Sequence, residues 1–143
     1  MDKNLWLETM RGLQTQTAIT HLGIEFVDID DDHIVLRMLI TDKARQPMGL
    51  LHGGVSMVLA ETAASTHACW GIDLTRVVPV GIEINGSHVR SAREGTVRAV
   101  GRVVRRSRSF IVHHVDISLE ESGELLSTAR VTNYYKKVNA DNE

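Results

Sequence analysis

Residues 46–65 read QPMGLLHGGVSMVLAETAAS, and this stretch predicts the element around which the rest of the chain folds. From Gly54 to Trp70 there is no proline and helix-forming residues dominate, and Gly71 follows as a stop signal. We therefore expect one central helix over residues 54–70. Its many small residues favour a helix packed closely on several sides: Ala60, Ala63, Ala64, Ser65 and Ala68.

The segments before and after this helix have the patterns of a strand-rich domain. Residues 3–15 space their apolar groups as a short amphipathic helix does, and residues 23–41 nearly alternate around an acidic run, which predicts a β-hairpin. Consecutive strands after one helix indicate an α+β fold with an antiparallel sheet, in a single domain over residues 1–143. The four further strands are expected over residues 77–89, 97–104, 111–119 and 125–135.

Composition and charge exclude several classes of function. The chain has 143 residues, 43% of them hydrophobic, and a net charge of −2, which does not fit a polycationic nucleic-acid binder. No run reaches the roughly 18 apolar residues of a membrane span, and the first residues lack the pattern of a signal peptide. We therefore expect a soluble, cytoplasmic protein. Cys69 is the only cysteine, and the histidines lack metal-binding spacing, so we expect no metal and no cofactor.

Gly53 and Glu61 are the first candidates for chemistry. Gly53 lies at the expected start of the helix, where amides lack intrahelical partners and can hold an anion or a developing oxyanion. Glu61 is an isolated carboxylate among alanines and aliphatic residues, and in such a setting it could act as a base near neutral pH. The plainer alternatives are a glycine that only makes the turn into the helix and a glutamate at an exposed helix edge. Residue types alone leave both open.

The spacing of these two residues sets a condition on any shared role. Glu61 follows Gly53 by eight residues, about 12 Å along a helix axis. One chain therefore cannot bring the carboxylate and the amide to the same carbonyl group. If both serve one reaction, they come from two subunits whose helices run antiparallel across a two-fold axis. The hypothesis requires a homo-oligomer with shared active sites.

Other polar residues flank these two candidates. Gln46 and His52 could orient a substrate carbonyl, although loop residues that cap backbone groups are at least as common. Ser65, one turn after Glu61, could hold a water beside the carboxylate, although small-residue packing explains it equally well. Arginines near two expected turns could bind phosphates or simply form a solvated basic edge. They are Arg90, Arg93, Arg106 and Arg108.

The stretch at residues 46–65, followed by VGIEINGSHVRSAREG at residues 80–95, closely resembles the hot-dog fold acyl-CoA thioesterases, and within them the bacterial aryl-CoA branch. The resemblance covers about residues 5–136. It implies a long central helix wrapped by a strongly curved antiparallel sheet. It also implies protomers that pair into dimers, and two dimers in a homotetramer.

The resemblance implies roles for individual residues. Glu61 would be the catalytic carboxylate, acting as general base or nucleophile on an acyl-CoA or acyl-carrier-protein thioester, and Gly53 would supply the oxyanion amide from the opposite subunit. Gln46 and His52 would lie near the thioester carbonyl, and Ser65 would position water. The residues that would contact coenzyme A, along the pantetheine arm and at the nucleotide, are Val80, Gly81, His88, Arg90, Ser107 and Arg108.

Departures from the family pattern leave the acyl group undetermined, and two rival functions remain as alternatives to thioester hydrolysis. Thr62 stands where serine is more usual, and Cys69 and Trp70 would line the acyl group differently, which leaves the acyl group undetermined. A hot-dog hydratase or dehydratase would place an Asp–His pair at its site, and no such pair stands out in the sequence. A non-catalytic acyl-CoA-binding regulatory domain would not need Glu61.

Overall fold

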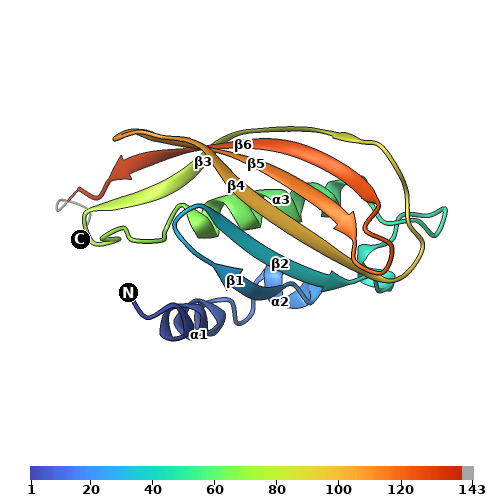
Figure 1. The fold of residues 1–143 in the computed structure, drawn as a ribbon. Coiled ribbons are helices and arrows are strands. Elements are labelled where there is room, and N and C mark those ends of the chain that lie inside the picture. The colour runs from blue at the N-terminus through green and yellow to red at the C-terminus, as the bar shows by residue number, and fades with distance from the viewer. Residues whose placement is uncertain (140–143) are drawn as a thin grey trace.

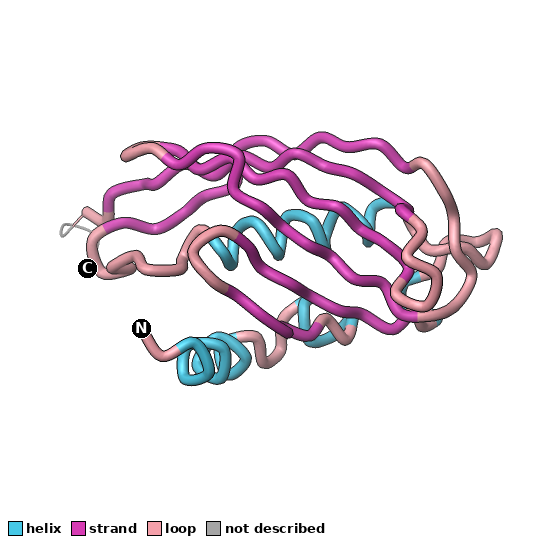
Figure 2. The backbone as a smooth tube through the Cα atoms, in the orientation of Figure 1, coloured by secondary structure: helices cyan, strands magenta, loops and turns pink. Residues whose placement is uncertain are grey.

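A computed structural model of the protein describes residues 1–139 and confirms the predicted α+β arrangement (Figure 1). Six antiparallel strands form one sheet in the order β1-β2-β4-β5-β6-β3. The sheet curves around a single long helix, α3, as Figure 2 shows. The helical elements are α1 (Lys3–Leu13), α2 (Ala18–Leu22), the 3-10 turn η1 (Asp42–Ala44) and α3 (Gly53–His67). The strands are β1 (Glu25–Ile29), β2 (His33–Leu39), β3 (Val77–His88), β4 (Thr96–Arg106), β5 (Phe110–Leu119) and β6 (Leu125–Lys137).

Most element boundaries differ from the predicted ones by one to three residues, and two short helical elements were not predicted. The central helix begins at Gly53 and ends at His67, earlier than residues 54–70, and its C-terminal Ala68 carbonyl accepts a hydrogen bond from the Tyr135 hydroxyl at 2.9 Å. A turn follows, in which Gly71 has φ 71°, the left-handed region that favours glycine. Neither α2 nor η1 was predicted, because such short elements carry no measurable periodicity.

The small residues of α3 let the helix lie close to the sheet. Leu59, Ala60 and Ala63 are completely buried in the main hydrophobic core. On β4, a Cβ added to Gly101 would lie 3.7 Å from the Ala63 Cβ and 3.1 Å from Ile34 Cγ2, so small residues on both sides permit the close approach. This close packing holds the helix, and the polar side chains it carries, at a defined height above the sheet.

The two edge strands of the sheet, β1 and β3, differ in length and in exposure. β1 is short, bulged and packed against α1. β3 is a 12-residue edge strand that pairs only with β6 among the described residues, and most of it is exposed. Its Ile82 side chain is 55% exposed. A long, exposed edge with apolar side chains is a template for pairing with another strand.

Two histidines form a hydrogen-bonded pair inside the core. His67 at the end of α3 and His113 on β5 are both fully buried, and His67 Nδ1 lies 2.7 Å from His113 Nε2. His67 Nε2 donates to the Asp30 carbonyl at 2.7 Å, so its Nδ1 must accept from His113. Burial lowers the pKa of both side chains, and it lowers the pKa of His113 to about 3, with smaller contributions from His67 and Arg106.

This pair predicts a loss of stability in mild acid. A histidine whose pKa is lower in the folded than in the unfolded chain stabilises the fold above pH 6.5, and that stability is lost as pH falls from 6.5 toward 3. His113 alone is expected to remove about 2 kcal/mol from the unfolding free energy between pH 8 and pH 5, as one pKa unit corresponds to about 1.4 kcal/mol. Urea unfolding at both pH values measures this difference.

The adjacent histidine provides a matched control for this prediction. His113→Gln should flatten the pH dependence of the unfolding free energy, since glutamine can donate to His67 but does not titrate. His114→Gln should retain the decrease caused by the buried pair, because the exposed His114 side chain takes no part in the hydrogen bond between His67 and His113. An unaltered slope in His113→Gln would contradict the assignment.

Candidate active site

The start of α3 presents one free amide. His52 caps the helix, with its Nδ1 accepting from Gly54 N–H at 2.8 Å. Gly53 N–H donates to no group within residues 1–139. The Gly53 position also requires glycine, because a Cβ there would lie 2.6 Å from His88 Nε2. The result is an unpaired N–H at the positive end of a helix, as an oxyanion site needs.

A hollow of about 360 Å³ opens in front of this amide, and we call it the glycine hollow. Gln46 and His88 line it together with Gly53. The Gln46 Oε1 accepts a hydrogen bond from Met48 N–H, which leaves the amide nitrogen of Gln46 as the group available to a ligand. His88 Nδ1 is held by the Ser127 hydroxyl at 2.7 Å. The hollow therefore offers hydrogen-bond donors to a carbonyl oxygen.

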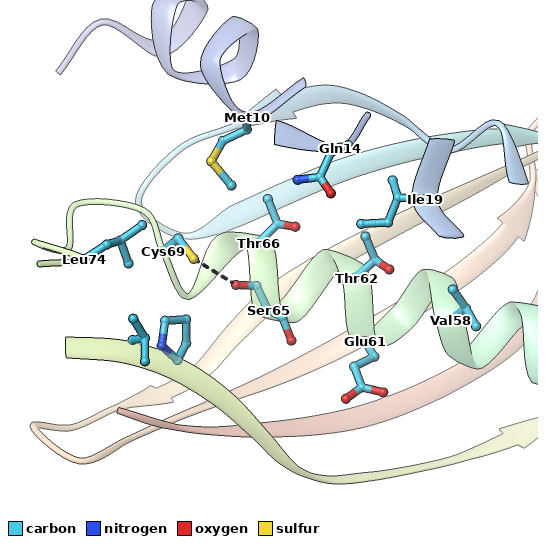
Figure 3. A pocket seen from close by; sticks show the side chains of 12 residues that line it. Met10, Gln14, Ile19, Val58, Glu61, Thr62, Ser65, Thr66, Cys69 and Leu74 are labelled. Carbon is cyan, nitrogen blue, oxygen red and sulfur yellow. Dashed lines mark hydrogen bonds between the residues drawn. The ribbon is translucent and has the colours of Figure 1, made fainter. Parts of the chain in front are cut away.

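Glu61 lies in a second hollow of about 520 Å³, which we call the glutamate hollow (Figure 3). Glu61 is exposed in the single chain. Its carboxylate rests against the backbone of β3, where a Cβ added to Gly81 would lie 2.6 Å from Glu61 Oε1. Ser65, one turn further along α3, points to the same side, and its hydroxyl donates to Asn133 Oδ1 at 3.1 Å. The glutamate hollow therefore places a carboxylate and a hydroxyl side by side.

Within one chain the two hollows are separate. Among the described residues none lines both, and Gly53 and Glu61 stand at different turns of α3, as their axial spacing predicted. Both hollows are bordered by residues of β3, the edge strand whose outer side has no strand partner within residues 1–139: His88 at the glycine hollow, and Val78 with Pro79 at the glutamate hollow. The arrangement is compatible with a partner strand completing each site.

The candidates for coenzyme A binding fall into two groups. His88 and Arg90 lie at the glycine hollow, where Arg90 also forms an exposed ion pair with Glu124 at 2.8 Å. Ser107 and Arg108 lie in the β4–β5 turn, near the opposite end of β3, about 36 Å away along the strand. One coenzyme A molecule could contact both groups only if they belong to different protomers.

Several of these side chains are already engaged within the fold. The Ser107 hydroxyl accepts from Phe110 N–H at 3.0 Å and closes the turn. His52 serves as a helix cap, the plainer of the two roles considered for it. Val80 and Gly81 lie on β3, both exposed, with Gly81 directly behind the Glu61 carboxylate.

Cys69 and Trp70 follow Ser65, and their side chains point in different directions. The expectation that Trp70 would line the acyl group is wrong. Cys69 lines the glutamate hollow, but burial raises the pKa of its thiol to about 11, so it is no nucleophile at neutral pH. Trp70 does not contact the hollow: its ring packs against Trp6 with centroids 5.2 Å apart, and its Nε1 donates to Asp31 at 2.8 Å. Both residues lie in the turn that follows α3, where the backbone changes direction, and their side chains therefore leave the chain on different sides.

An Asp–His pair, which a hydratase or dehydratase would need, does not line either hollow in the part of the chain that the structure describes. Asp–His pairs do exist, His33 with Asp30 at 2.7 Å and His114 with Asp116 at 2.8 Å, but neither histidine lines either hollow. Within residues 1–139, no group of three or more His, Cys, Asp or Glu side chains is arranged to hold a metal ion. No helix in that part of the chain is both long and apolar enough to cross a bilayer.

Sequence reasoning missed two residues at the glutamate hollow. Asn133 reaches the site from β6, and Gln14 reaches it from the end of α1. Gln14 lies opposite Thr62 and Thr66, while Met10 and Ile19 add apolar surface to the same wall (Figure 3). No local motif marks these positions, because their role depends on strand register and helix docking.

Comparisons with known proteins find a matching family model, similar sequences and similar solved structures. The family model described as the thioesterase superfamily matches residues 48–126. A 1,4-dihydroxy-2-naphthoyl-CoA hydrolase of Escherichia coli is 36% identical over 130 residues, covering 91% of this chain and 94% of the relative. The proofreading thioesterase EntH of Cronobacter turicensis is 34% identical over 132 residues, covering 91% and 93%. The crystal structure of a thioesterase from Haemophilus influenzae matches with a TM-score of 0.88 at 33% identity, over 96% of this chain and 94% of that one.

Proposed function

Because the chain belongs to the thioesterase superfamily and is an acyl-CoA thioesterase, we propose that its substrate is an aroyl-CoA and that each active site combines Glu61 of one protomer with Gly53 of the other. The observation that carries the proposal is the separation of the free Gly53 amide and the Glu61 carboxylate into two hollows along β3, whose outer side has no strand partner in the described part of the chain. Two copies paired through β3 around a two-fold axis would bring the hollows of different chains together.

The proposed chemistry begins at the thioester carbonyl. The carbonyl oxygen accepts a hydrogen bond from Gly53 N–H, which strengthens as the oxygen becomes negative. Gln46 supplies a second donor beside it. Glu61 then removes a proton from water, which attacks the carbonyl carbon, or attacks that carbon itself to form a mixed anhydride that water hydrolyses. In either route the thiolate of coenzyme A leaves and is protonated. Single turnover in ¹⁸O-water tests for the anhydride route: if water attacks the Glu61 carbonyl of the anhydride, ¹⁸O enters the Glu61 carboxylate and an unlabelled enzyme oxygen leaves in the product, which the general-base route cannot produce.

The lining of the glutamate hollow supports an aromatic acyl group. Its walls are mostly apolar, from α1, α2, α3 and the segment leading into β3, and its volume of about 520 Å³ is in the range of small-molecule sites. Besides Glu61 and Ser65, three polar side chains interrupt the apolar wall: Gln14, Thr62 and Thr66. Such a wall suits a planar ring that carries a polar substituent. We propose the nucleotide of coenzyme A near Arg90 of one protomer and Arg108 of the other, with the pantetheine arm along Val80 and Gly81.

A substrate panel tests the proposed acyl group. Thiol release from benzoyl-CoA, 4-hydroxybenzoyl-CoA, 1,4-dihydroxy-2-naphthoyl-CoA, hexanoyl-CoA and palmitoyl-CoA is followed with a disulfide reagent. We expect kcat/KM for the best aroyl-CoA to exceed that for either fatty acyl-CoA by about 10-fold or more, the scale of a well-filled against a poorly filled apolar pocket. A preference for palmitoyl-CoA would contradict the aroyl assignment and leave thioester hydrolysis intact.

A further inference from the structure

A buried asparagine lies directly behind the candidate catalytic glutamate. Asn133 of β6 is in register with Gly81 of β3, and its side chain is fully shielded from solvent. Its Oδ1 accepts the hydrogen bond from the Ser65 hydroxyl at 3.1 Å, while its Nδ2 has no partner among the described residues. A buried amide with unused hydrogen-bonding capacity destabilises a fold. Its presence here therefore calls for a reason other than stability.

The Asn133 amide borders the same small space as the carboxylate. A Cβ at Gly81 would lie 2.6 Å from Glu61 Oε1 and 3.7 Å from Asn133 Oδ1. Glu61 and Ser65 leave the same side of α3 on successive turns (Figure 3). Carboxylate, hydroxyl and amide thus adjoin one another beside β3, from two elements that are far apart in the sequence.

The Ser65–Asn133 hydrogen bond determines what Ser65 can offer to a ligand. A serine hydroxyl has one proton, and Ser65 gives it to Asn133 Oδ1, so only lone pairs of Ser65 Oγ remain for other partners. The ionised Glu61 carboxylate likewise presents only lone pairs. A water molecule between Ser65 and Glu61 must donate a proton to each of them. The lone pairs of that water are then directed away from both, toward the substrate.

Building on the proposed thioester hydrolysis, we propose that Asn133 is a positioning residue that holds Ser65 as a hydrogen-bond acceptor and thereby orients the attacking water. The water oxygen forms a bond to the carbonyl carbon, one of its protons passes to Glu61, and the π electrons of the carbonyl become the oxyanion at Gly53. Collapse breaks the carbon–sulfur bond, and the departing thiolate takes the proton from Glu61. The second water proton stays on the new carboxylic acid. Asn133 touches no reacting atom and acts through Ser65.

Kinetics on benzoyl-CoA, or on the best aroyl-CoA of the panel, test the proposal. Asn133→Ala should lower kcat about 10-fold and change KM less than twofold, because the lost hydrogen bond orients water and does not hold substrate. Ser65→Ala should show a similar loss. The double variant Ser65→Ala/Asn133→Ala should be no slower than Ser65→Ala within a factor of two, since the amide works only through the hydroxyl.

Asn133→Asp provides the sharper readout. Ionised aspartate accepts the Ser65 hydrogen bond but cannot donate one, so kcat should recover to within about threefold of wild type at high pH. The acid limb of the kcat–pH profile should move to higher pH, because a second carboxylate beside Glu61 disfavours ionisation of both. Asn133→Ala should lack this recovery at every pH. A purely structural role for Asn133 predicts neither the rescue nor the displaced limb.

Val131→Ala is the matched control, since it truncates a fully buried side chain on the same strand. It should lower Tm and leave kcat unchanged.

Three results would each overturn the proposal. They are a wild-type kcat in Asn133→Ala, a multiplicative loss of kcat in the double variant, and a kcat of Asn133→Asp that is as low as that of Asn133→Ala at all pH values. If circular dichroism shows that Asn133→Ala is unfolded, Asn133→Asp tests the proposal by itself, through the recovery of kcat at high pH and the displaced acid limb of its kcat–pH profile. Full activity in Glu61→Ala would instead refute the proposed function, whatever Asn133 does.

Discussion

Glu61→Ala is expected to lower kcat for thioester hydrolysis by a factor of about 100 or more, the scale of a lost general base. The change removes the only carboxylate that lines the glutamate hollow among the described residues. KM should change little, because in the proposed mechanism the carboxylate contacts the attacking water or the carbonyl carbon and does not hold coenzyme A. Thiol release over a range of substrate concentrations measures both constants.

An exposed glutamate on another helix controls for a general loss of charge. Glu8 on α1 is exposed and lines neither hollow, so Glu8→Ala should retain wild-type kcat. Glu61→Gln keeps the shape of the side chain and should be as slow as Glu61→Ala. Equal turnover in wild type and Glu61→Gln would show that the carboxylate takes no part in the reaction.

Subunit complementation should restore activity to two inactive variants. Gly53→Ala is expected to lose about 100-fold in kcat, since its Cβ would lie 2.6 Å from a His88 ring that Ser127 holds in place, and the oxyanion amide must move. A mixed dimer of Gly53→Ala with Glu61→Ala has one site with both lesions and one with neither. Mixed dimers purified through two different tags should therefore show about half of wild-type kcat per dimer.

This experiment separates a shared site from a site within one chain. If Gly53 and Glu61 of the same chain served one reaction, every site in the mixed dimer would carry one lesion and activity would stay near the level of the single variants. Gly12→Ala is the matched glycine control, because a Cβ there meets no atom within 4 Å. Light scattering should show at least a dimer in all variants, and a fully active wild-type monomer would contradict the shared site.

The central helix and the positions of its candidate residues were predictable because their signals are local. Helix propensity between Gly54 and Trp70, the two glycines after His52 and the lone Glu61 are all contained in one short stretch. The axial distance between Gly53 and Glu61 follows from helix geometry alone, and the structure places them in separate hollows accordingly. Alternating apolar residues likewise predicted the six strands and the α+β class, with ends that differ by a few residues.

Residues that enter the site through long-range packing were not predictable. Asn133 meets Ser65 across 68 positions because β6 pairs with β3 in one register, and a shift of one residue would turn the amide to the other face of the sheet. His67 meets His113 across 46 positions because α3 packs against β5. Trp70 was expected at the acyl group. It lies on the opposite side instead, because its ring packs against Trp6 of the docked helix α1 and its Nε1 donates to Asp31.

Local sequence preferences therefore account for which segments are helix and strand, and for the residue types that could carry acyl transfer. Strand register and helix docking account for the pairing of Ser65 with Asn133, the contact of Glu61 with Gly81, and the unpaired edge at β3. The physical reason is range: propensity and periodicity act over a few neighbouring residues, whereas hydrogen bonds and packing in the folded chain join positions whose separation in sequence carries no signal.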